Sequence, residues 1–164
     1  MSLGGGGGGG GPGQQQMQQI SQEIQAIEGE IDELDEEIND LQQEQREMDE
    51  AIDAIGEIDT GSTVQVPLGG GAYVRAEVQD LDEIVVSLGG DYAAELEEGD
   101  AVDALENRKD ALDEQIERVR EEKADLEAES QQLEQQAQQM QQQMQQQQMQ
   151  QMQQMADESD DGDE

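Results

Sequence analysis

The apolar residues of this chain fall into two long stripes in which steps of three and four residues alternate. Such steps mark the seam of a coiled-coil helix, so the pattern predicts two long helices, over about residues 14–56 and 100–155. The first stripe is Met17, Ile20, Ile24, Ile27, Ile31, Leu34, Ile38, Leu41, Gln45, Met48, Ile52 and Ile55. The second stripe is Val102, Leu105, Lys109, Leu112, Ile116, Val119, Lys123, Leu126, Ser130, Leu133, Ala137, Met140 and Met144.

The connector between the stripes is short, which favours folding the two helices back on each other as an antiparallel hairpin. If Ile55 faces Val102, every seam residue meets a seam residue and no polar seam residue faces another. Lys109 then faces Met48 and Lys123 faces Leu34, so each long stem can cover an apolar partner while its charged end reaches water. The sequence therefore predicts a mainly α-helical fold built on a long antiparallel coiled coil.

The connector, residues 57–99, breaks the helical period and predicts two short β-hairpins. Two β-rich runs flank Gly69–Gly71, and two more flank Gly89–Asp91, as expected for tight turns between strands. Strands this short are not stable alone in water, so their apolar residues are expected to pair with other subunits, in a β-barrel. The residues expected to mediate this assembly are Val64, Val66, Val74, Val78, Ile84, Val86 and Leu88.

Composition excludes several functional classes. The 164 residues include no Cys, no His, no Trp and no Phe, which removes thiol nucleophiles, imidazole bases and Cys/His zinc sites. We therefore expect no enzymatic activity, no catalytic residues, no cofactor and no metal. No export signal and no long apolar run are found, so a cytoplasmic protein without membrane contact is expected.

The charge is strongly negative, with 43 acidic against 7 basic residues and a formal net charge of −36. Such a surface repels phosphate, so nucleic-acid binding is not expected. Adaptation to molar salt explains the acidity, because the Debye length there is about 3 Å and self-repulsion is screened. An acidic partner-binding surface is the alternative, but it is disfavoured because the carboxylates are spread along the chain.

Two strings in the connector resemble those of archaeal prefoldin alpha subunits. They are Val-Pro-Leu-Gly-Gly-Gly-Ala-Tyr-Val-Arg-Ala-Glu-Val, over Val66–Val78, and Val-Ser-Leu-Gly-Gly-Asp-Tyr-Ala-Ala-Glu, over Val86–Glu95. The resemblance extends over about residues 14–144, and the acidity is typical of a halophilic archaeon.

The resemblance implies an ATP-independent chaperone in which two alpha and four beta subunits join their hairpins into a double β-barrel. Six coiled coils extend from that barrel, hold non-native client proteins at their tips and deliver them to a group II chaperonin. Residues 62–96 would then form the assembly region. A structural coiled-coil tether without client binding is the alternative function.

The chain ends are expected to be a flexible Gly-rich tail over residues 1–13 and a disordered acidic tail over residues 156–164. The predicted register places the last methionines opposite the glycine tail, which would leave them uncovered. Methionine is flexible and suits irregular apolar surfaces, although a Gln/Met-rich run is equally typical of a low-complexity tail. The residues expected at a client-binding tip are Met17, Ile20, Met140, Met144, Met149, Met152 and Met155.

Overall fold

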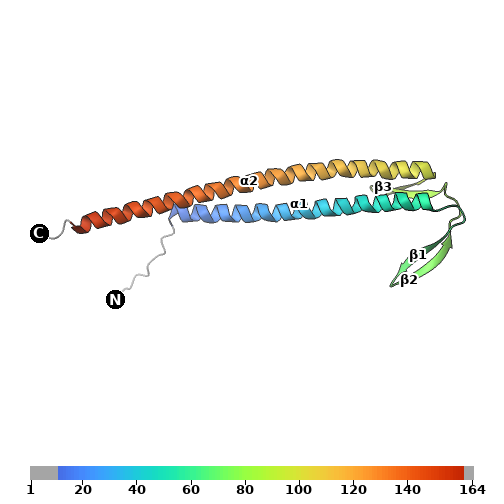
Figure 1. Ribbon diagram of the computed structural model, residues 1–164, viewed down its shortest axis with the longest axis horizontal. Coiled ribbons are helices and arrows are strands. Elements are labelled where there is room, and N and C mark those ends of the chain that lie inside the picture. The colour runs from blue at the N-terminus through green and yellow to red at the C-terminus, as the bar shows by residue number, and fades with distance from the viewer. Residues whose placement is uncertain (1–10, 161–164) are drawn as a thin grey trace. The chain divides into compact units, whose positions relative to one another are not determined.

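The computed structural model describes residues 11–160. The elements follow one another as α1 (Pro12–Glu57), β1 (Thr63–Gly69), β2 (Ala72–Glu77), β3 (Ile84–Gly89), β4 (Tyr92–Leu96) and α2 (Glu98–Asp160), as Figure 1 shows. The predicted mainly α-helical class, with two short β-hairpins between two long helices, is confirmed.

The chain divides into two compact units, and each contains a segment of both helices. In the first unit, residues up to 35 of α1 lie along residues from 121 of α2. A methyl group added at Gly13 would lie 3.5 Å from the Sδ atom of Met144, while Asp35 bonds to Lys123. From Gly13 to Asp35 the residue numbers rise along α1, while those of the α2 partners fall from Met144 to Lys123. The two segments are therefore antiparallel.

The second unit, residues 36–120, contains the end of α1, both hairpins and the start of α2. Its helix segments are also antiparallel, because Gln45 bonds to Asp113 whereas Asp49 bonds to Lys109. Seam residues supply the core of this unit, together with one strand residue and Ala101 at the start of α2. The buried apolar residues are Leu41, Met48, Ile55, Val86, Ala101, Leu105, Leu112, Ile116 and Val119.

The described part of the first unit has a thinner core than the second. Only Ile20 and Ile27 are buried apolar residues there, joined by the polar Ser130. Ser130 and Ile27 are partners in the predicted register, and both are 8 % exposed. Apolar burial, the main stabilising term in folding, is therefore concentrated in the unit that carries the hairpins.

Helix α1 starts earlier and ends later than its sequence pattern suggests. It begins at Pro12, a favoured first helical residue, and it continues through Gly56, the predicted last residue, to Glu57. Gly56 has no positive φ; the chain reverses instead at Asp59–Ser62, where Gly61 has φ +88° and the Ser62 amide bonds to the Asp59 carbonyl at 2.9 Å.

Helix α2 also extends beyond the predicted bounds. It begins at Glu98, so Asp100, where the helix was predicted to start, lies in its first turn. It continues to Asp160, so residues 156–160 of the predicted acidic tail are helical. Pro12 and Gly13 of the predicted Gly-rich tail are helical as well, and residues 1–10 and 161–164 lie outside the described residues.

The two hairpins form separate two-stranded antiparallel sheets with the same turn. Gly70 and Gly71 have φ +59° and +80°, and Gly90 and Asp91 have φ +59° and +63°, as a type I′ turn requires. Each sheet also shifts register by one residue before its turn, at Leu68 and at Leu88 respectively. Glycine serves here because most residues avoid positive φ, while Asp tolerates it.

Candidate interaction surfaces

The β1–β2 hairpin presents apolar side chains to solvent. Val66 and Val74 face each other across the strands and are 41 % and 46 % exposed. Leu68 and Tyr73, next to the turn, are 68 % and 62 % exposed. Among the described residues, no side-chain hydrogen bond joins β1 or β2 to either helix. Both edges of this sheet and its apolar residues are thus available to a partner.

The β3–β4 hairpin differs because its own chain covers part of it. Val86 is only 5 % exposed, so the expectation that it lacks partners within the chain is wrong. Arg108 of α2 donates from Nη1 to the Ser87 carbonyl at 2.9 Å and from Nη2 to Glu44 Oε1 of α1 at 2.7 Å. One guanidinium therefore ties the strand to both helices.

The other expected assembly residues are divided between these environments. Val64, Val78 and Ile84 are half-buried, whereas Leu88 is 52 % exposed. Leu88 is two residues from Val86 on the same strand but lies at the register shift, a place where the strand bends and side chains can be re-aimed. Val85 of β3 and Tyr92 of β4 are 64 % and 75 % exposed, although the sequence pattern did not single them out for assembly.

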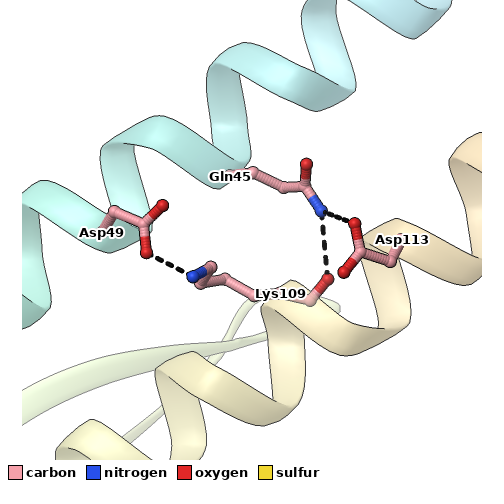
Figure 2. A network of polar contacts seen from close by, with 4 residues as sticks. All are labelled: Gln45, Asp49, Lys109 and Asp113. Carbon is pink, nitrogen blue, oxygen red and sulfur yellow. Dashed lines mark hydrogen bonds and ion pairs between the residues drawn. The ribbon is translucent and has the colours of Figure 1, made fainter.

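A polar network interrupts the apolar seam of the second unit. Gln45 donates from Nε2 to the Lys109 carbonyl at 3.3 Å and to Asp113 Oδ1 at 2.5 Å, while the Lys109 ammonium bonds to Asp49 (Figure 2). The hydrogen bond that Lys109 donates to Asp49 raises the pKa of Lys109 above its usual value; partial burial opposes this, and the nearby charges of Asp49, Asp113 and Glu106 add to it. Met48, the predicted partner of Lys109, is 5 % exposed.

A similar bridge occurs two heptads further along α2. Lys123 lies 2.6 Å from Asp35 and 3.7 Å from Glu127, and Asp35 stands two heptads before Asp49 in the sequence. The hydrogen bond that Lys123 donates to Asp35 raises the pKa of Lys123, again against the effect of burial, and the charges of Asp35 and Glu127 also raise it. Both lysines of the second stripe thus find a carboxylate on α1.

The expected tip residues separate into three degrees of exposure. Met149, Met152 and Met155 are 64 %, 72 % and 72 % exposed, whereas Met17, Met140 and Met144 are half-buried. Ile20 is only 7 % exposed, so the expectation that it stays accessible is wrong. Helix α1 begins two turns before Ile20, and both helices still flank it: Ile20, Leu133 and Met140 line one groove.

The three exposed methionines, called here the methionine row, lie off the seam. Steps of three and four continue the second stripe from Met144 through Gln147, Gln151 and Gln154. Met149, Met152 and Met155 repeat instead at intervals of three, which places them along one side of the helix, away from the seam line. A helix paired along the seam would therefore leave the methionine row accessible.

The described residues contain no group of three or more side chains that could hold a metal ion. Within residues 11–160, no helix is long and apolar enough to cross a membrane. No buried polar side-chain atom in this part of the chain lacks a hydrogen-bond partner. The distinctive surfaces are thus the two hairpins and the methionine row.

Residues 27–148 match the family described as Prefoldin subunit. The chain is 67 % identical over 73 residues to the prefoldin subunit alpha of Halorubrum lacusprofundi, covering 44 % of this chain and 48 % of that protein. It is 59 % identical over 81 residues to the prefoldin subunit alpha of Haloarcula marismortui, covering 49 % of this chain and 53 % of that protein. The chain thus spans about half the length of these curated relatives.

Among solved structures, a filamentous PFD from Methanocaldococcus jannaschii aligns with a TM-score of 0.48 and 28 % identity, covering 73 % of this chain and 95 % of that chain. The family match extends over most of the chain, and the chain therefore belongs to the prefoldin subunit family. The resemblance to archaeal prefoldin alpha subunits, drawn from the two glycine-turn strings, is confirmed by the haloarchaeal relatives.

Proposed function

We propose that this chain is the alpha subunit of an ATP-independent chaperone that holds non-native proteins. The family match supports the class of activity, and the observation that carries client binding is the exposed methionine row. Flexible, polarizable thioethers adapt to apolar segments of varied sequence, as a chaperone must. Met17, Met140 and Met144, which are half-buried on the seam, are proposed to add apolar surface at the same end of the coiled coil.

Assembly is assigned chiefly to the β1–β2 hairpin. Its cross-strand pair Val66 and Val74 is about half exposed. Burying such a pair in a partner's sheet would add apolar contact and satisfy the open strand edge. Two alpha and four beta subunits, joined through their hairpins, are the proposed complex.

Delivery of clients to a group II chaperonin completes the proposed function. The alternative, a structural tether without client binding, requires the two helices but no exposed methionines beyond the seam. The methionine row is the feature that favours the chaperone.

The decisive experiment compares complexes reconstituted with the same beta subunits in molar KCl. In the test variant, Met149, Met152 and Met155 become Gln, which keeps length and helix propensity. In the matched control, Gln147, Gln151 and Gln154 become Ala, three changes at the same helix end that remove no thioether. We expect the test variant alone to suppress aggregation of a denatured salt-tolerant client less well, with a partial loss because beta tips remain.

The assay first requires native mass spectrometry to show equal assembly of all variants. Unchanged client capture by the test variant, within an intact complex, would contradict client binding by the methionine row. Equal losses in both variants would assign the effect to the helix end and not to its thioethers.

A further inference from the structure

The chemistry of this chain leaves methionine as its principal target for two-electron oxidation. The 164 residues contain eight Met but no Cys, no His and no Trp, so no thiol is present to react first. Methionine thioethers are oxidised to sulfoxides, which are polar, and reductases reverse the reaction. Exposure therefore decides which methionine of the chain reacts first.

The methionines of the described residues differ widely in exposure. Met48 is 5 % exposed in the seam, Met17, Met140 and Met144 are half-buried, and the methionine row is 64–72 % exposed. The row lies off the seam, so pairing of the helices does not cover it. The most accessible thioethers thus coincide with the proposed client-binding surface.

We propose that Met149, Met152 and Met155 form a reversible oxidation site that controls client binding. A peroxide or a hypohalous acid is the oxidant: one oxygen atom is transferred to each sulfur, the thioether loses two electrons, and water or a halide ion with a proton is released. This inference rests on the proposed function of the methionine row.

The chemical consequence follows from the neighbours of the row. All other residues from Gln145 to Gln154 are glutamine, so the thioethers are the apolar groups of this segment. Three sulfoxides would leave a helix surface of amides and sulfinyl oxygens, with little apolar area for a client to bury. The seam of the second unit would be unaffected, because its methionine, Met48, is only 5 % exposed.

The first test measures where oxidation occurs. The purified chain is exposed to limiting hydrogen peroxide in molar KCl, and tandem mass spectrometry locates each sulfoxide over time. We expect the methionine row to react several-fold faster than Met48, with Met17, Met140 and Met144 between them. Equal rates for the row and Met48 would overturn the proposed site.

The second test measures client capture after the peroxide has been removed and untreated beta subunits added. Oxidised wild type should fall to the level of the Met149→Gln, Met152→Gln, Met155→Gln variant, and methionine sulfoxide reductases should restore it. The corresponding Leu variant keeps an apolar row without sulfur, so its capture should survive oxidation. Circular dichroism checks that the helices persist in each sample.

The outcomes separate the two proposals. If the Gln variant loses capture while oxidised wild type retains it, the oxidation control is wrong and the client-binding surface stands. If the Gln variant captures normally, the client-binding surface itself is wrong, and the oxidation control is overturned with it. Loss of capture by the oxidised Leu variant would assign the effect to other residues and also overturn the proposed site.

Discussion

The two β-hairpins share a local design but have different surroundings. Val66, Leu68, Gly69 and Gly70 correspond to Val86, Leu88, Gly89 and Gly90, and both hairpins have the same turn and register shift. Yet Val66 is 41 % exposed and Val86 only 5 %. The difference shows that strand sequence sets the hairpin, whereas contacts from elsewhere decide whether it is free for a partner.

A contact from helix α2 illustrates how the difference arises. The backbone carbonyl of Ser87 accepts a hydrogen bond from Arg108, whereas among the described residues no side-chain hydrogen bond joins β1 or β2 to a helix. The covered hairpin thus belongs to the core of its unit, while the β1–β2 hairpin leaves its apolar pair exposed. We expect substitutions in the two hairpins to separate folding from assembly.

The largest effect is expected for Val86→Asp. Loss of valine burial costs about 1.5–3 kcal/mol, and an unpaired carboxylate in this place costs about as much again or more. Urea unfolding of the isolated chain in molar KCl should show this loss. Val66→Asp is the matched control, expected to change the free energy of unfolding by about 0.5 kcal/mol or less; equal losses would contradict the distinction between the hairpins.

Assembly, in contrast to folding, is expected to depend on the β1–β2 hairpin. Val66→Asp with Val74→Asp should leave a folded chain that no longer joins beta subunits, because two carboxylates would have to be desolvated in the new interface. Native mass spectrometry of the co-expressed subunits measures this. Gln65→Asp, on the same strand but outside that pair, should assemble normally, and a complete complex from the double variant would refute the assignment to β1–β2.

Sequence reasoning succeeded where a short pattern determines the outcome. The seam spacing predicted both helices, and the glycine turns predicted both hairpins, because positive φ strongly favours glycine. The burial of Val86 could not be predicted, since the two hairpins have nearly the same apolar pattern. Arg108 was missed because it lies off the seam, where a charged residue usually faces solvent.

The helix ends and the tip were only partly predictable. Helix α1 was predicted to end at Gly56, but this glycine has no positive φ and fits within a helix turn at modest cost. Ile20 was predicted to stay exposed at the tip, but side chains of both helices surround it, and Ile20, Leu133 and Met140 line one groove.

A moderate effect is expected for Arg108→Met, which removes both hydrogen bonds but keeps an apolar stem. Its side chain is one-third exposed, so we expect a loss of about 1 kcal/mol, below the usual range for charged hydrogen bonds. Amide hydrogen exchange should accelerate in β3 and β4 but not in β1 and β2.

Lys109→Met is the control for this result because it removes the neighbouring charge, which bonds to Asp49. It should not accelerate exchange in the β3–β4 hairpin. Similar acceleration by both variants would indicate that general loss of charge pairing, and not the bond to Ser87, loosens the hairpin.

A smaller effect concerns pH and the helix seam. The pKa values of Lys109 and Lys123 are raised in the folded chain. Their contribution to the stability of the folded chain is therefore fully present below the unfolded pKa of about 10.4, and it is lost as pH rises through the folded pKa. The thermal midpoint should therefore fall in this alkaline range. The fall should be smaller in the Lys109→Met, Lys123→Met variant; an identical profile would exclude the seam lysines as its cause.

The smallest effect is expected from exchanging the turn residues of the two hairpins. Asp91 and Gly71 occupy the same turn position, with φ +63° and +80°, and nothing lies within 4 Å of a Cβ added at Gly71. Gly71→Asp should thus be accepted, and restricting the unfolded chain would offset the cost of positive φ, leaving a change within about 0.5 kcal/mol. Gly71→Val, whose branched side chain disfavours this φ, should cost about 1–2 kcal/mol. Urea unfolding measures the stability of both variants. Assembly should weaken only in the Val variant, as a result of its lower stability, since both side chains point into open space. A large loss for Gly71→Asp would show that the turn of the free hairpin, unlike that of the covered one, requires glycine.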